Sequence, residues 1–212
     1  MIECCTSLIK DNNGENKLPK SCLILYASWT GNTEKIALIF KNVFERNGWS
    51  CDLYKVDRNT DFTKIPFNYD DYDFMCVGSP IHNSLPLEEV ITSLRKASME
   101  QSHKALPHEK IIFSGKKGIT FATYSGAHLG PKEAIVALSW MDLEMEHKRF
   151  QCIGNFCCPG YTPPPVEKNS INLPSEDACY HGDISNRPNQ KDFQRAEMFI
   201  EDILEEIAIR LG

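Results

Sequence analysis

The feature of this sequence that most constrains its fold is a regular alternation between short apolar runs and segments with helical periodicity. The first apolar run, residues 22–27, is almost unbroken, which is typical of a parallel strand buried on both faces. After it, apolar residues recur at helical spacing over residues 36–44, and Asn47-Gly48 supplies a stop signal. Strand and helix repeated in this order predict an α/β fold, with a parallel sheet covered by helices on both faces.

The same alternation continues to the end of the chain. Residues 51–56 alternate polar and apolar side chains, as expected for a strand at the edge of the sheet, and three further strands are predicted at 74–77, 119–123 and 150–156. Pro86 and Pro131 each stand where the first position of a helix is expected, ahead of an apolar stripe. Residues 193–211 form the clearest amphipathic helix of the chain.

The length of 212 residues fits one domain. Residues 1–20 are polar, and we interpret them as a loose N-terminal arm preceding a folded domain at 21–212. Residues 157–190 are rich in proline and too irregular to form another strand–helix unit, so we interpret them as an insertion. Loops of this length are uncommon and are often functional.

Hydropathy, charge and cysteine content indicate where the protein is located and which classes of partner it can have. No apolar run approaches the ~20 residues that a membrane span needs, and residues 1–20 are too polar for a secretory signal, so we expect a cytoplasmic protein. A net charge of -6 argues against a general nucleic-acid binder, which needs a basic face. Nine cysteines, an odd number without a signal sequence, are expected to be mostly reduced thiols.

A hexapeptide with several hydrogen-bond donors follows the first strand. Loops at the carboxyl ends of parallel strands border the crevice where such sheets bind ligands, and a helix N-terminus there suits a phosphate group. The pattern matches neither the P-loop nor the Gly-x-Gly-x-x-Gly fingerprint, which disfavours a nucleoside triphosphate or NAD. The alternative is a capped helix start without a ligand. The phosphate interpretation would fail if Thr30 and Thr33 pointed into a packed interior. The residues are Ser28, Trp29, Thr30, Gly31, Asn32 and Thr33.

This Ser-x-Thr-Gly-Asn-Thr pattern resembles the FMN-phosphate loop of flavodoxins, and residues 26–37 are similar to the flavodoxin modules of flavodiiron proteins. The resemblance covers residues 21–212, although the proline-rich insertion fits it poorly. It implies a three-layer, doubly wound, five-stranded parallel sheet with strand order 2-1-3-4-5. It also implies one non-covalently bound FMN.

By the same resemblance, two further loops hold the isoalloxazine ring, mainly through their backbone groups. The best-known flavodoxins stack a Trp and a Tyr on the ring, but the first of these loops contains neither residue. Tyr124 is the candidate for stacking, His82 or Ile81 could replace the missing aromatic, and Trp29 could cover one edge. The first loop contributes Ser79, Pro80, Ile81, His82 and Asn83, and the second contributes Thr123, Tyr124, Ser125, Gly126, His128 and Gly130.

Other chemistry is less well supported by the sequence. His82 and His128 could act in acid–base chemistry, but simple contact with FMN is the preferred interpretation, so no catalytic residue is assigned. The histidines lack metal-ligand spacing, and no metal is expected. Cys157 and Cys158 do not match common iron–sulfur spacings; they are either incidental thiols or redox-active thiols beside the flavin, and the role of Cys179 stays open.

Three functional hypotheses remain. The preferred one is an electron carrier that serves redox partner proteins, in which the acidic protein lowers the second reduction potential of the flavin. The second is an FMN-dependent NAD(P)H oxidoreductase acting on quinones or other small electron acceptors. The third is a binding module without flavin, since a fold alone does not fix a function. The electron donor, the acceptor and the oligomeric state are left open.

Overall fold

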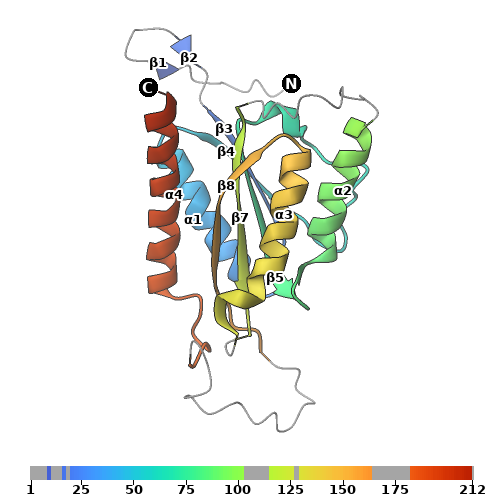
Figure 1. The fold of residues 1–212 in the computed structure, drawn as a ribbon, viewed down its shortest axis with the longest axis vertical. Coiled ribbons are helices and arrows are strands. Elements are labelled where there is room, and N and C mark those ends of the chain that lie inside the picture. The colour runs from blue at the N-terminus through green and yellow to red at the C-terminus, as the bar shows by residue number, and fades with distance from the viewer. Residues whose placement is uncertain are drawn as a thin grey trace.

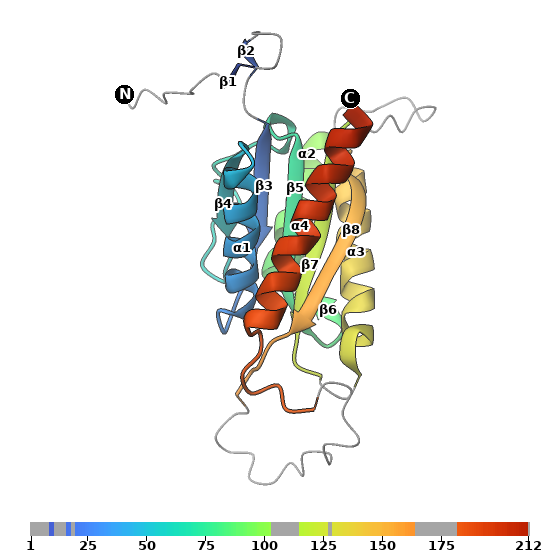
Figure 2. The same ribbon diagram turned by 90° about the vertical axis from the view of Figure 1, so that its left-hand side faces the viewer.

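In a computed structural model, the structure describes residues 9–10, 16–17, 20–102, 115–126, 129–163 and 182–211. Figures 1 and 2 show three layers, with a central sheet between two pairs of helices. One face is covered by α1 and α4, and the other by α2 and α3. The helices are α1 (Asn32–Arg46), α2 (Glu88–Ser102), α3 (Ile135–His147) and α4 (Gln190–Leu211), with 3-10 turns η1 (Tyr69–Asp71) and η2 (Gly130–Ala134).

The strands of the central sheet run parallel in the order β4-β3-β5-β7-β8. Numbered along the chain, this is the predicted order 2-1-3-4-5, and β4 lies at an edge as its alternating pattern indicated. Their bounds are β3 (Ser21–Tyr26), β4 (Ser50–Lys55), β5 (Phe74–His82), β7 (Lys117–Tyr124) and β8 (Gln151–Pro159). The fifth strand therefore extends to Pro159, into a segment that we assigned to the insertion.

The prediction that Pro86 opens a helix was wrong. Strand β5 continues to His82 and folds back through β6 (Leu85–Pro86), with Ile81 opposite Pro86 and His82 opposite Leu85. The turn residues Asn83 and Ser84 both have positive φ, 52° and 63°, as a two-residue hairpin turn requires. Proline is tolerated in so short an outer strand because no further strand needs its missing N–H. The helix begins at Glu88 instead.

Alternate residues of β3 pack into two separate cores. Cys22, Ile24 and Tyr26 pack with α1 and α4, whereas Leu23 and Leu25 pack on the side of α2 and α3. This division follows from the two-residue period of a strand, and it explains why the run is apolar throughout. The interior position of β3 fixes the place of the loop that follows it, at the carboxyl edge of the sheet.

The described residues cover only part of the predicted N-terminal arm and of the predicted insertion. Within the arm, β1 (Ile9–Lys10) pairs antiparallel with β2 (Asn16–Lys17). Its other residues before position 20 and residues 164–181 of the proline-rich segment lie outside the described residues. The arm and the insertion therefore stay predictions. In the described part of the chain, no helix combines the length and the apolar character that crossing a membrane requires.

Candidate functional site

The loop between β3 and α1 has a run of backbone N–H groups that find no acceptor among the described residues. Gly31, the N-cap residue of α1, lies in the left-handed region at φ 82° and offers no side chain to cap the helix. The first helical hydrogen bond joins the Lys35 N–H to the Gly31 carbonyl at 3.1 Å, and the Glu34 N–H donates to Ser28 Oγ at 3.3 Å. Among the described residues, nothing accepts from the five N–H groups of residues 29–33. Such a run at a helix N-terminus attracts an anion.

The side chains of the same loop are only partly available to a ligand. Thr30 is exposed, and its Oγ1 accepts from Asn32 Nδ2 at 3.1 Å. Asn32 Nδ2 also donates to the Tyr161 carbonyl at 2.7 Å. Thr33 is buried, with its Oγ1 2.8 Å from Thr123 Oγ1. The Thr33 hydroxyl was expected to donate to a ligand, but it points into the interior. The Thr30 side chain is at the surface. An anion at this loop would therefore be held mainly by backbone groups.

A carboxylate beside this loop is balanced by neighbouring donors. Lys55 Nζ donates to Glu34 Oε2, and the Tyr26 hydroxyl donates to Glu34 Oε1, each at 3.0 Å. The hydrogen bond from Lys55 lowers the pKa of Glu34. Burial and the bond to Glu34 raise the pKa of Tyr26. The negative charge of Glu34 is thus paired with a cation and opposes an anion at the loop less than an isolated carboxylate would.

The hairpin formed by β5 and β6 presents some of the predicted residues but not others. Ser79 is buried; its Oγ donates to the Pro80 carbonyl at 2.8 Å and accepts from the Leu87 N–H at 2.9 Å. The Ser79 side chain therefore fixes the start of α2 instead of facing a ligand. His82 and Asn83 are exposed. The His82 ring lies 5.5 Å from the Trp29 ring, so two of the candidate aromatic residues meet.

The loop after β7 corrects the predicted stacking residue. Tyr124 is 2% exposed and packs in the core beneath α2 and α3, so its ring is not available to stack on a flavin. The Gly126 N–H donates to the Glu133 carboxylate, and the Gly130 N–H donates to the Gly126 carbonyl at 3.1 Å. These two N–H groups shape the loop. Ser125, directly after β7, is exposed. The predicted His128 lies outside the described residues.

Two cysteines at the end of β8 were a candidate for redox chemistry. Cys157 packs against the core on the side of α2 and α3, and Cys158 is buried in the core formed with α1 and α4. Burial raises the pKa of both thiols, which keeps them protonated and weakly nucleophilic at neutral pH. Their burial therefore favours the interpretation of both as incidental thiols that pack in the core, over that of redox-active thiols. Cys179 lies outside the described residues.

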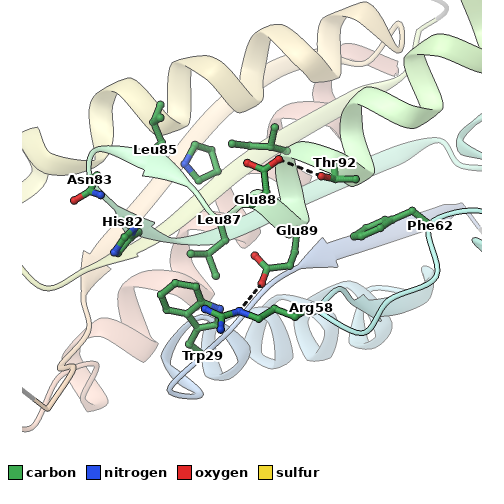
Figure 3. Close-up of a pocket in the computed structure, with 12 residues that line it drawn as sticks. Trp29, Arg58, Phe62, His82, Asn83, Leu85, Leu87, Glu88, Glu89 and Thr92 are labelled. Carbon is green, nitrogen blue, oxygen red and sulfur yellow. Dashed lines mark hydrogen bonds and ion pairs between the residues drawn. The ribbon is translucent and has the colours of Figure 1, made fainter. Parts of the chain in front are cut away.

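A pocket of about 610 Å³ opens beside the loop, between the hairpin, α2 and the segment after β4 (Figure 3). Arg58 lies 5.0 Å above the Trp29 ring, and its Nε is 3.5 Å from the carboxylate of Glu89. The Arg58 side chain is 76% exposed, whereas that of Glu89 is only 8% exposed. Arg58 was not among the predicted site residues, although it follows the carboxyl end of a predicted strand, as the other site loops do.

Comparison with known proteins supports the fold. No family model matches the chain. An uncharacterized protein of Methanocaldococcus jannaschii is 26% identical over 183 residues, covering 86% of this chain and 97% of that protein.

Several solved structures are similar to the whole domain. The rubredoxin oxygen:oxidoreductase of Desulfovibrio gigas has a TM-score of 0.59 at 17% identity, over 92% of this chain and 38% of that one. A flavodoxin from the domain Archaea has a TM-score of 0.54 at 14% identity, over 89% and 99% of the two chains. A Bacillus cereus flavodoxin has a TM-score of 0.57 at 13% identity, over 88% and 98%. The predicted flavodoxin-like fold is confirmed. This chain spans little more than a third of the oxidoreductase.

Proposed function

We propose that this flavodoxin-like chain binds one FMN non-covalently and carries electrons between redox partner proteins. The observation that carries the proposal is the run of five N–H groups at residues 29–33 for which the described part of the chain offers no acceptor. They lie at the N-terminus of α1 and at the carboxyl edge of the sheet, where a terminal phosphate would receive several hydrogen bonds and the favourable end of the helix dipole.

The ring of the flavin would lie over the neighbouring loops at the same edge. The backbone of the hairpin at His82 and Asn83 would border the ring on one side, and the exposed Ser125 after β7 would border it on the other. Once bound, the flavin supplies the electron chemistry, and the chain supplies binding, orientation and control of the potential. The fold similarities support a flavoprotein of this kind, since flavodoxins are among the matching structures.

The proposal is tested by comparing FMN with riboflavin, which lacks the phosphate. Dialysed protein is titrated with each flavin, and quenching of flavin fluorescence reports binding. One charge-assisted hydrogen bond contributes about 1.5–3 kcal/mol, so FMN should bind at least about tenfold more tightly. Equal affinities for FMN and riboflavin would contradict the proposed phosphate site. No affinity for either flavin would favour a binding module without flavin.

A pair of glycine substitutions tests the loop itself. Gly31 and Gly115 have similar φ values, 82° and 78°, and in both cases a Cβ would meet nothing within 4 Å. Gly31→Ala and Gly115→Ala should therefore cost similar stability, about 1–2 kcal/mol for a left-handed alanine. Gly115 precedes β7, at the opposite edge of the sheet. Only Gly31→Ala should weaken FMN binding, by about tenfold, in the fluorescence titration; equal binding by both variants would contradict the site.

One observation favours a second candidate function, an FMN-dependent NAD(P)H oxidoreductase acting on small acceptors. The pocket beside Trp29 is large enough for a small molecule. Steady oxidation of NAD(P)H by the FMN-loaded protein, dependent on an added quinone, would support this candidate. A protein that holds FMN but consumes no NAD(P)H would support the carrier.

A further inference from the structure

The pocket beside Trp29 is separate from the loop that follows β7. Its walls come from the loop after β3, the segment after β4, the hairpin and the first turns of α2, and of the described residues after β5 none from β7 or its following loop (123–126 and 129–130) lines it. Because β5 lies between β3 and β7, its hairpin stands between this pocket and the β7 loop. The pocket is therefore an additional cavity next to the proposed flavin position.

Aromatic and aliphatic side chains make up much of its wall. Trp29 is 51% exposed, an unusual state for the largest apolar side chain, and Leu85 is also exposed. The His82 ring is tilted by 59° against the indole at 5.5 Å. Phe62 and Ile91 contribute further apolar surface. Exposed rings that border a cavity can stack on a planar ligand.

The charges in the pocket argue against an anionic ligand. Arg58 contributes one positive charge, and it is paired with the buried Glu89. Glu88 adds a second carboxylate, whose nearest described partner is the hydroxyl of Thr92 at 3.4 Å. One cation and two carboxylates give a net charge of -1, with His82 counted as neutral. Figure 3 shows both carboxylates on the first turn of α2. A phosphate-bearing dinucleotide would be repelled here.

Hydrogen-bond donors remain for a neutral ligand. The guanidinium of Arg58 is largely exposed and projects over Trp29 (Figure 3). Asn83 lines the same cavity and carries an amide N–H₂. These two groups can donate to carbonyl oxygens at the rim of a flat ring system.

We propose that this pocket binds a neutral, planar aromatic compound with carbonyl groups, of the quinone type. The proposal extends the second candidate function, but the binding needs no flavin, so it can fail or succeed independently of FMN binding.

The test uses calorimetry with a neutral naphthoquinone and with the same ring system carrying a sulfonate. The neutral compound should bind at least about fivefold more tightly to the native protein. Glu88→Gln, an exposed change, should strengthen binding of the sulfonate several-fold and leave the neutral compound unaffected. Equal affinities for the two probes, or no response of the sulfonate to Glu88→Gln, would overturn the proposal.

Two further measurements locate the binding. Trp29→Ala should weaken the neutral probe about fivefold or more, whereas Trp49→Phe, in the opposite core, should not. The titrations are repeated with FMN-loaded protein, and unchanged affinity is expected. Complete loss of probe binding on FMN loading would mean that the flavin ring itself fills this cavity, and the proposal of a separate site would be wrong.

Discussion

The ion pair between Lys55 and Glu34 sets the charge next to the partnerless N–H groups. Because Glu34 has a lowered pKa in the folded protein, its contribution to stability is present above its ordinary pKa and is lost as the pH falls through the lowered value. Lys55 also shields an incoming phosphate from the carboxylate.

Lys55→Met should therefore raise the pKa of Glu34 and weaken FMN binding several-fold at low salt, with little effect at high salt. The pKa is measured by NMR titration of the side-chain carbon, and binding is measured by flavin fluorescence. Lys64→Met removes a similar exposed pair with Asp61 and serves as the control for net charge. If both variants changed FMN binding equally, the local role of Lys55 would be refuted.

At the other edge of the sheet, Lys148 is buried with its Nζ 3.9 Å from a carboxylate oxygen of Glu144. Burial lowers the pKa of Lys148 to about 8, so the folded protein loses this proton before the unfolded chain does. The unfolded state then binds more protons between about pH 8 and the ordinary value of 10.5, and this residue alone makes stability rise with pH there.

Lys148→Met should remove that rise. Buried thiols with raised pKa values, such as Cys22, act in the opposite direction over the same range, so the quantity to measure is the difference between the variant and the native protein. Urea unfolding from pH 7 to pH 10.5 gives the free energy of unfolding of each protein. That of the variant should fall relative to that of the native protein as the pH rises. A constant difference would show that Lys148 does not titrate there.

Among the elements, β5 and β7 approach each other closely at glycine positions, and Gly78 is one of them. A Cβ at Gly78 would lie 2.1 Å from Cζ of Phe121, inside the packed core. Gly78→Ala should destabilise the protein by about 1–3 kcal/mol, as overpacking does. Gly154→Ala, where the nearest side-chain atoms are 3.1 Å away, should cost less. Urea denaturation measures both, and similar losses would mean that the Phe121 ring moves aside freely.

Apolar periodicity was sufficient to predict the five parallel strands, the helices that cover them and the layers, because it records which side chains are buried. It could not predict the hairpin after β5, which depends on positive φ at Asn83 and Ser84. The inward direction of Tyr124 depends on how far β7 continues before the chain turns, and no local pattern specifies that. The site loops were found because chain order places them at the carboxyl ends of strands, whereas partners such as Thr123 for Thr33 are set by tertiary packing.

At the scale of the whole molecule, the net charge of -6 acts on any bound redox group. Adding electrons to a flavin in an acidic protein is disfavoured, so the second reduction potential of bound FMN should lie below that of free FMN. Salt should reduce the shift, because it screens the more distant charges. Spectroelectrochemical titration at low and high salt measures this, and a potential equal to that of free FMN would contradict it.

The hydrogen bond from Asn32 to the Tyr161 carbonyl joins the proposed anion loop to the chain that leaves the last strand. If occupancy of the loop strengthens this bond, ordering of the chain near Tyr161 must in turn strengthen occupancy by the same free energy, because thermodynamic linkage is reciprocal. A partner that binds the protein after β8 and orders this chain would thereby raise the affinity of the loop for its cofactor.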